Sequence, residues 1–362
     1  TDNSGDAARP MKTSTAVSAS FAAACLVVLW VFSHPAPDLP SSFDDLVFDT
    51  IFELGTETGA PHQVFEGIWD IEASSDGRLA VLDLGGPGVH LFNSDGGHIS
   101  SLTEIGLGEG QLDRPSGIAW SMPGRLTLWD PGSSWVSSFD VGLGSLTFRG
   151  RWRAFAFGET GFCSVRDRTY ISYWHDGKII HEFGLEGPVA SFGEAPHVVG
   201  VDQLGPELRE IAIEELTPSA LLCTPRGVMD VSFTQSLVRL HGEDGQEVWS
   251  REIEDFNPII AYSDDGIGLG RRFDAGKGSH LLRSVVPWGD SMVLIQHEVR
   301  MREIPDEGEI IILESRLLSL ENGDEMARTR DLPLVSGAQG DRLYLVRDSP
   351  LSKVTVVRVD LG

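Results

Sequence analysis

Hydrophobic and polar positions alternate in short runs along most of the chain, and glycine or proline bounds nearly every run. One stretch, residues 117–150, reads GIAW, a Met-Pro-Gly turn, RLTLWD, SWVSSFD and, after a glycine-rich turn, SLTFRG. Short strands separated by such turns are typical of antiparallel sheet. The pattern therefore predicts an all-β fold built from short antiparallel strands.

The same residues return at a fixed spacing in the first half of the chain. Phe92 returns as Phe139, and four further positions keep this offset of 47 residues: Gly77, Arg78, Leu79 and Asp83 return as Gly124, Arg125, Leu126 and Asp130. Because several residue types keep one period, the repeat is a structural unit. A unit of four strands that repeats every 40–50 residues or so is typical of a β-propeller blade.

Six four-stranded blades account for the chain from residue 67 onward. Their predicted bounds are 67–103, 115–150, 152–184, 209–254, 280–332 and 333–361. The last blade lacks one strand, and a strand-like segment, 46–54, lies unused before the first. We expect this N-terminal strand to complete the last blade, which closes the ring and leaves no open sheet edge. Seven blades are the alternative, because residues 255–279 fit either an insertion or a degenerate blade.

Residues 16–32 form an uncharged, strongly apolar segment that follows Lys12 and precedes several aspartates. This pattern predicts one apolar N-terminal helix, either a cleaved signal peptide or a retained membrane anchor. Basic residues before the segment and acidic ones after it place the rest of the chain on the periplasmic or extracellular side of a bacterial membrane. We therefore divide the chain into an extension with the signal or anchor (1–32), a linker rich in proline and serine (33–44) and the propeller (45–362).

The charge of the chain limits its possible partners, and its cysteine content limits its possible disulfides. The 362 residues include 28 basic and 54 acidic side chains, a formal net charge of -26. A surface this acidic repels phosphate, so nucleic acid is excluded as a partner. Of the three cysteines, Cys25 lies in the apolar segment, which leaves at most one bridge, Cys163–Cys223. The sequence leaves open whether these two form a disulfide or remain buried thiols.

One stretch resembles a known repeat. Residues 106–112 (GLGEGQL), 115–119 (PSGIA), 124–130 (GRLTLWD) and 139–140 (FD) follow the pattern of an NHL repeat closely, and the first unit follows it moderately. The chain therefore resembles the six-bladed NHL-repeat type of β-propeller, in a divergent, exported or membrane-anchored bacterial form. The resemblance implies a ligand-carrying top face. It implies no reaction, because such folds host many functions.

Candidate chemistry lies near the starts of the first two inner strands, at the expected mouth of the central channel. The residues there are His62, Glu66, Asp113 and Arg114. Glu66 and Asp113 are either an acid/base pair or solvent-facing loop residues of an acidic chain. No two histidines lie two or four residues apart, so the sequence has no local zinc motif. We assign no catalytic, cofactor or metal-binding residue, and no motif supports a calcium ion in the channel.

Two further features have alternative interpretations. Asp83, Asp130, Asp167 and Asp348 are predicted to end second strands, where an aspartate accepts hydrogen bonds from the following turn. A ring of calcium ligands is the alternative. The acidic segment 301–311 fits no blade strand and is either a recognition loop or a solvated loop without function.

The sequence favours a non-catalytic exported propeller that binds a protein, a small ligand or a glycan through one face. Such a chain suits an accessory subunit of a membrane or envelope assembly, held to the membrane through residues 16–32 if they are not cleaved. The alternative is a metal-dependent hydrolase or lyase, similar to a lactonase, with its site at the mouth of the central channel.

Overall fold

The computed structural model describes residues 43, 46–85, 88–154, 161–264, 266–274, 278–302, 309–347 and 352–360. The predicted signal or anchor and nearly all of the predicted linker lie outside these residues. Within them, α2 (Pro206–Leu216) is too short and too polar to cross a membrane, and no other described helix is long enough.

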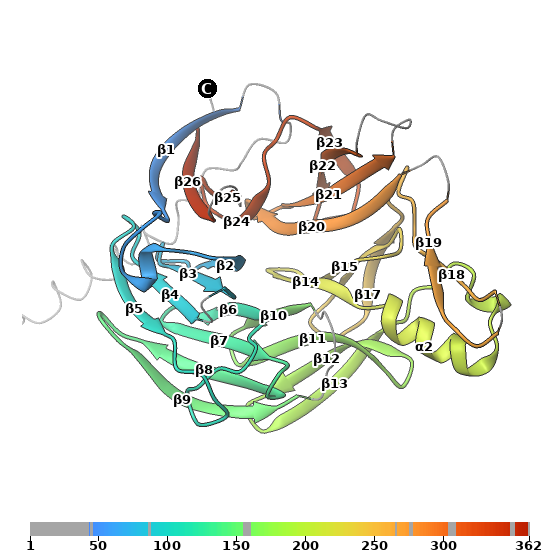
Figure 1. The fold of residues 1–362 in the computed structure, drawn as a ribbon, viewed down its shortest axis with the longest axis horizontal. Coiled ribbons are helices and arrows are strands. Elements are labelled where there is room, and N and C mark those ends of the chain that lie inside the picture. Colours follow the sequence, from blue (N-terminus) through green and yellow to red (C-terminus); the bar gives the residue numbers. More distant parts are fainter. Residues whose placement is uncertain are drawn as a thin grey trace, which may run out of the picture.

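Six four-stranded antiparallel sheets form a ring (Figure 1). In blades 1 to 3 the strands are β2 (Ile68–Ala73), β3 (Leu79–Asp83), β4 (Gly88–Phe92) and β5 (His98–Leu102); β6 (Gly117–Met122), β7 (Arg125–Asp130), β8 (Trp135–Val141) and β9 (Leu146–Arg153); and β10 (Phe162–Val165), β11 (Arg168–His175), β12 (Lys178–Gly184) and β13 (Gly187–Glu194). In blades 4 to 6 they are β14 (Ser219–Thr224), β15 (Gly227–Ser232), β16 (Val238–His241) and β17 (Glu247–Arg251); β20 (Ser279–Trp288), β21 (Met292–Arg302), β22 (Glu309–Ser319) and β23 (Glu325–Thr329); and β24 (Val335–Gln339), β25 (Arg342–Arg347), β26 (Lys353–Asp360) and β1 (Val47–Leu54).

The ring closes through the N-terminal strand, as predicted. β1 pairs with β26 in antiparallel register from Val47 opposite Asp360 to Leu54 opposite Val354. The count of six is also confirmed, because the strands among the described residues from 255 to 278 form a two-stranded hairpin, β18 (Ile260–Tyr262) with β19 (Gly270–Arg272). A two-stranded hairpin is too small to be a blade, so the seven-bladed alternative is wrong.

Two predicted blade boundaries are wrong. Blade 3 was expected over 152–184, but Trp152 belongs to β9, and the blade runs from Phe162 to Glu194. Its outermost strand, β13, is largely exposed and lacks a buried alternating face, so the hydrophobic pattern did not reveal it. Blade 4 was expected to begin at residue 209, where the structure has α2 instead.

The helix has local signals that the strand pattern concealed. Pro206 occupies its first turn, and Leu208, Ala212 and Leu216 recur every four residues on its buried face. With the short helix η2 (Val201–Gln203), this face packs on Ala261 of β18. We call η2, α2, β18 and β19 the lateral unit, which lies beside blade 4 at the outside of the ring (Figure 1).

Side chains join neighbouring blades where no strand pairing does. The innermost strands contact one another around the centre of the ring, and polar side chains of one blade bond to backbone groups of the next. The bonds run from the Ile118 N–H to Asp70, from the Ser219 N–H to the Ser172 hydroxyl, and from the Val335 N–H to the Gln296 amide oxygen. These bonds satisfy buried donors and fix the spacing of the inner strands.

A disulfide strengthens one of these seams. Cys163 on β10 and Cys223 on β14 are bonded, with their Cα atoms 5.6 Å apart. The bridge therefore ties the inner strands of blades 3 and 4, and it settles the alternative that the sequence left open.

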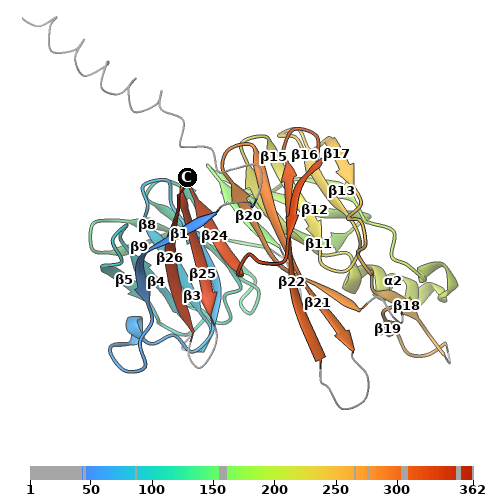
Figure 2. The same cartoon turned by 90° about the horizontal axis from the view of Figure 1, so that it is seen from above.

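The acidic segment 301–311 was wrongly predicted to fit no strand. Met301 and Arg302 end β21, and residues 309–311 begin β22, in register across the hairpin. Figure 2 shows β21 and β22 projecting beyond the strands of the neighbouring blades. The isoleucines at 310–312 have high β propensity, which explains why β22 extends as far as Glu309 beside the acidic residues of this segment. Residues 303–308 lie outside the described residues.

Candidate functional site

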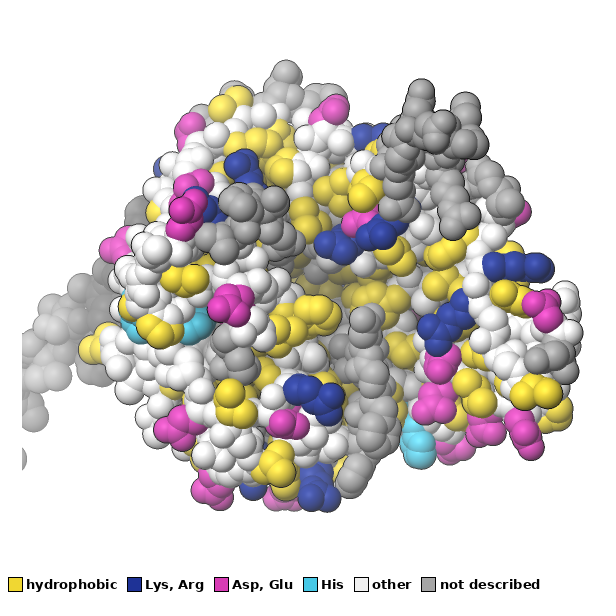
Figure 3. Space-filling view, in the orientation of Figure 1, with side chains coloured by type: hydrophobic (Ala, Val, Ile, Leu, Met, Phe, Trp, Pro, Cys, Tyr) yellow, Lys and Arg dark blue, Asp and Glu magenta, His cyan; other side chains and the backbone are white. Residues whose placement is uncertain are grey.

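Hydrophobic side chains surround a hollow near the centre of one face of the ring, with basic side chains at its edge (Figure 3). The hollow has a volume of about 190 Å³ and lies between the inner strands of blades 1, 4, 5 and 6. We call it the channel mouth. It is lined by 68–71, Ala220, Leu221, Phe233, 282–285, Ser336 and Val346.

A carboxylate of the inner strand β2 forms one wall of the channel mouth. Asp70 accepts hydrogen bonds from the N–H groups of Ile71 and of Ile118 in blade 2, each 2.9 Å long. Burial raises the pKa of Asp70 to about 6, although these two bonds favour the charged form. Glu72 lies two residues further along, on the same face of the strand, and both burial and the Asp70 charge raise its pKa well above its usual value.

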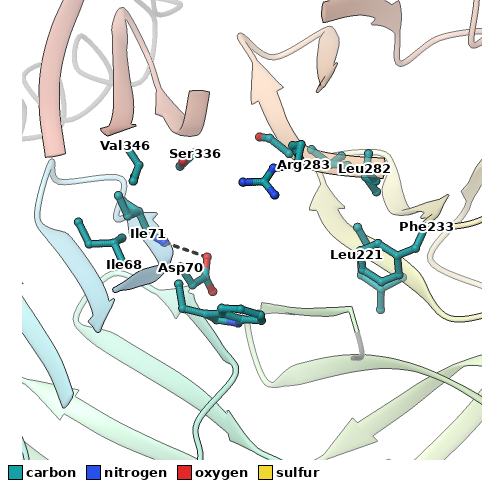
Figure 4. A pocket seen from close by; sticks show the side chains of 13 residues that line it. Ile68, Asp70, Ile71, Leu221, Phe233, Leu282, Arg283, Ser336 and Val346 are labelled. Atoms are coloured by element: carbon teal, nitrogen blue, oxygen red, sulfur yellow. Dashed lines mark hydrogen bonds between the residues drawn. The ribbon is translucent and has the colours of Figure 1, made fainter. Parts of the chain in front are cut away.

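A cation lies across the hollow from this carboxylate. Arg283 extends from β20 toward the space in front of Asp70 (Figure 4). Its Nε atom is 3.5 Å from a carboxylate oxygen of Glu298, and 39% of its side chain is exposed. The ion pair with Glu298 holds the Arg283 guanidinium at the edge of the hollow. Because Glu298 also pairs with Arg300, it does not fully occupy the Arg283 guanidinium, and part of that group stays available to a ligand.

An exposed aromatic ring completes the rim. Trp69 is 54% exposed, yet its indole N–H donates a 3.0 Å hydrogen bond to the backbone oxygen of Ser116 in blade 2. The bond restricts the ring, so little conformational entropy remains to be lost on binding. A restrained, half-exposed tryptophan is typical of the anchors of protein interfaces.

The four predicted site residues lie elsewhere. His62 is in the short helix η1 (Pro61–Gln63), where its ring stacks on that of His98 in the outermost strand of blade 1, with centroids 3.7 Å apart. Glu66 precedes β2, and Asp113 and Arg114 precede β6, at equivalent places in blades 1 and 2. All four are described residues, and none of them lines the channel mouth.

The backbone N–H groups of these loop residues have a structural role. Those of Asp113 and Arg114 donate to the Asp130 carboxylate at 2.7 and 3.0 Å, and that of Glu66 donates to Asp83 at 3.2 Å. Each second-strand aspartate thus fixes the loop that enters the inner strand of its blade.

The predicted hydrogen bonds from the following turn are also present. Gly85 N–H donates to Asp83, and Ser133 N–H donates to Asp130. The prediction is therefore confirmed for these two aspartates. It is wrong for Asp167, which lies in the turn between β10 and β11 and pairs with Arg125 at 3.1 Å. Asp348 lies outside the described residues.

Sequence reasoning missed Asp70 and Arg283. The available signal was in the strand IWDIEA, where Asp70 and Glu72 alternate with the buried Ile71. Charged side chains at alternate positions of an inner strand lie on one face of that strand, which indicates a polar surface near the centre of the ring.

The described residues hold no group of three or more histidine, cysteine, aspartate or glutamate side chains that could bind a metal ion. Two buried histidines have structural partners instead. The ring of His90 lies 2.8 Å from the Ser101 hydroxyl, and that of His241 lies 2.8 Å from the Asp230 carboxylate. The described part of the chain therefore offers the metal-dependent alternative no ligand set.

The fold is similar to that of solved bacterial proteins, although the sequence matches neither a family model nor a curated protein. A DUF4221 family member from Bacteroides vulgatus has a TM-score of 0.55 and 7% identity, over 87% of this chain and 98% of that one. A proposed exported protein from Bacteroides fragilis has a TM-score of 0.54 and 11% identity, over 87% and 95% of the two chains. At such identities the similarity shows a shared propeller fold and nothing of the activity.

Proposed function

We propose that this chain is an exported, non-catalytic propeller of divergent NHL-repeat type that binds a partner protein through the face with the channel mouth. The observation that carries the proposal is the size of the hollow. At about 190 Å³ it is smaller than the roughly 300–1,000 Å³ of small-molecule sites. It suits one or two side chains of a partner better than a whole ligand or glycan.

The chemistry of the rim supports a protein partner. Trp69 offers a restrained aromatic surface, and Arg283 and Asp70 offer opposite charges on opposite sides of the hollow. An apolar centre with a few polar groups is the usual composition of an interface hot spot.

The projecting hairpin enlarges the same face. The connection between β21 and β22 follows the second strand of its blade, so it lies at the end of the ring where the inner strands begin. Met301 is 36% exposed and Ile311 is 57% exposed near the end of this hairpin. Together with the channel mouth, these side chains form an apolar surface for a partner to contact.

Export is supported by the disulfide and by the N-terminal pattern. Disulfides persist in oxidising compartments and are rare in the cytosol, and the Cys163–Cys223 bridge fits that setting. We assign residues 1–32 to the signal or anchor, 33–44 to a linker and 45–362 to the propeller on the periplasmic or extracellular side.

Site-specific photocrosslinking tests the proposal. A benzoylphenylalanine replaces Trp69 in the full chain, expressed in its own host, and a matched chain carries it at Leu143, which is fully exposed in the turn between β8 and β9 at the other end of the ring. We expect a discrete crosslinked protein from position 69 and none from position 143. Equal crosslinking from both positions, or none from position 69, would contradict binding through this face.

A further inference from the structure

A second cavity lies between blades 3 and 4, at the opposite end of their inner strands from the channel mouth. Its volume is about 320 Å³, which falls within the range of small-molecule sites. The turn between β10 and β11 and the turn between β14 and β15 form two walls, and Glu243, in the turn between β16 and β17, lies on a third side. We call this cavity the seam pocket.

The inner part of the seam pocket is apolar and held in place. Val165, Val228 and Pro225 line it, together with Cys223 of the disulfide that ties the two walls. Gly227 fixes the second turn, because a Cβ atom there would lie 1.9 Å from the backbone oxygen of His241. The pocket is therefore formed before any ligand arrives, which lowers the entropy lost on binding.

Two arginines and a tyrosine give the pocket a polar side. Arg168 lies 3.3 Å from the buried carboxylate of Glu182 and also bonds to the hydroxyl of Tyr170, whose ring is buried. Both partners hold the Arg168 guanidinium in a fixed position, although about half of its side chain is exposed.

The second arginine has a weaker partner. Arg166 is 79% exposed, and its guanidinium lies 3.7 Å from the Glu243 carboxylate, which is itself 73% exposed. Ion pairs between such exposed side chains contribute little to stability. Another carboxylate that also gains apolar contacts in the pocket would replace Glu243 readily.

We propose that the seam pocket binds a small organic carboxylate with an aromatic or similarly sized apolar body. The body fills the space against Val228, Pro225 and the disulfide, and the carboxylate pairs with Arg166 and Arg168. A guanidinium binds a carboxylate through two parallel hydrogen bonds, which orients the ligand. Two guanidinium groups and one carboxylate, that of Glu243, line the pocket, while the Glu182 carboxylate that pairs with Arg168 is buried and does not line it. The groups that a ligand meets therefore favour an anion over a cation, in a chain whose net charge is -26.

This site is independent of the proposed partner surface, because it lies at the other end of the inner strands. Ligand-observed NMR titration of the full chain in a non-ionic detergent tests it, with 3-phenylpropionate as the probe and 3-phenylpropionamide as its neutral counterpart. We expect saturable binding of the acid at one site and binding of the amide that is at least about fivefold weaker, because the amide lacks the charge.

Two substitutions with opposite expected effects sharpen the test. Arg166→Gln should weaken binding of the acid about fivefold and leave the amide unaffected, whereas Glu243→Gln should strengthen binding of the acid about twofold by removing its competitor. Arg226→Gln is the matched control, because Arg226 is at the tip of the second turn and does not line the pocket. Both Arg166 and Glu243 are exposed, so neither change should unfold the chain.

Other outcomes would overturn the proposal. Equal affinity for acid and amide, or equal weakening by Arg166→Gln and Arg226→Gln, would show that the two guanidinium groups of the pocket do not recognise the carboxylate. Loss of probe binding in Trp69→Ala, with no change in Arg166→Gln, would move the site to the channel mouth. Absence of saturable binding would also refute the assignment.

Discussion

A buried ion pair within blade 4, which is also bonded to the end of blade 3, allows a quantitative test of how the ring is held together. Asp230 is fully buried and accepts hydrogen bonds from Arg239, at 2.9 Å from Nη2, while the His241 ring lies 2.8 Å away. Arg239, only 4% exposed, also donates a 2.6 Å bond to the backbone oxygen of Glu194 at the end of blade 3. Loss of the carboxylate would leave a guanidinium buried without its counter-charge.

We expect Asp230→Leu to lower the free energy of unfolding by about 3–5 kcal/mol, because removal of one partner strands the other charge in a low-dielectric interior. Burial by itself would raise the pKa of Asp230, but the hydrogen bond from His241 and the charge of Arg239 hold it below the usual 3.8. The contribution of the pair is therefore complete at neutral pH and is lost as the pH falls below about 4.

Equilibrium unfolding in urea at pH 7 measures this cost, and a double-mutant cycle isolates the pair. The variant with both Asp230→Leu and Arg239→Met removes both charges at similar volume, so it should be clearly more stable than the sum of the single changes implies. Asp140→Leu is the exposed control. Its carboxylate is 54% exposed and 3.5 Å from both Arg149 and Arg125, and we expect a change of at most about 1 kcal/mol. Additive single effects, or a cost for Asp230→Leu no larger than that of the control, would refute the reasoning.

Three further predictions concern pH, oxidation and metal. Burial lowers the pKa of His297 from 6.5 to about 3, so the unfolded chain takes up the proton first, and stability falls as the pH drops below 6.5. His297→Leu should therefore reduce the loss of stability between pH 7 and pH 5 by about 2 kcal/mol in urea unfolding, and an unchanged loss would contradict this. Replacing Cys163 and Cys223 by serine opens a bridge that spans 60 residues, which should cost about 4 kcal/mol; a variant as stable as the parent chain would count against a disulfide at the seam. EDTA should leave the melting temperature of the chain unchanged. A fall of several degrees would support the metal-dependent alternative.

Part of the fold could be predicted because its signals are local. Turn glycines such as Gly77 and Gly124 have positive φ angles of 84° and 80°, and the strands beside them alternate within a few residues. The closing strand was predictable because the last blade lacked its fourth strand, and the strand-like residues 46–54 were left over to supply it.

The candidate site was not predictable in the same way. Loop positions at the starts of inner strands suggested Glu66 and Asp113, but neither residue lines the hollow, which is formed mainly by residues within the strands. Asp70 and Arg283 face one another although they belong to blades 1 and 5. Only closure of the ring places them on the same hollow, and no spacing in the sequence indicates that placement.

The sequence by itself determined the repeating unit and the strand that closes the ring, and it favoured six blades over seven, because hydrophobic alternation and turn chemistry act between neighbours in the chain. The tertiary structure alone decided which residues meet at the channel mouth and at the seam pocket, and whether Cys163 and Cys223 are bonded. Those contacts join different blades, and their geometry depends on how the six sheets are arranged around one axis.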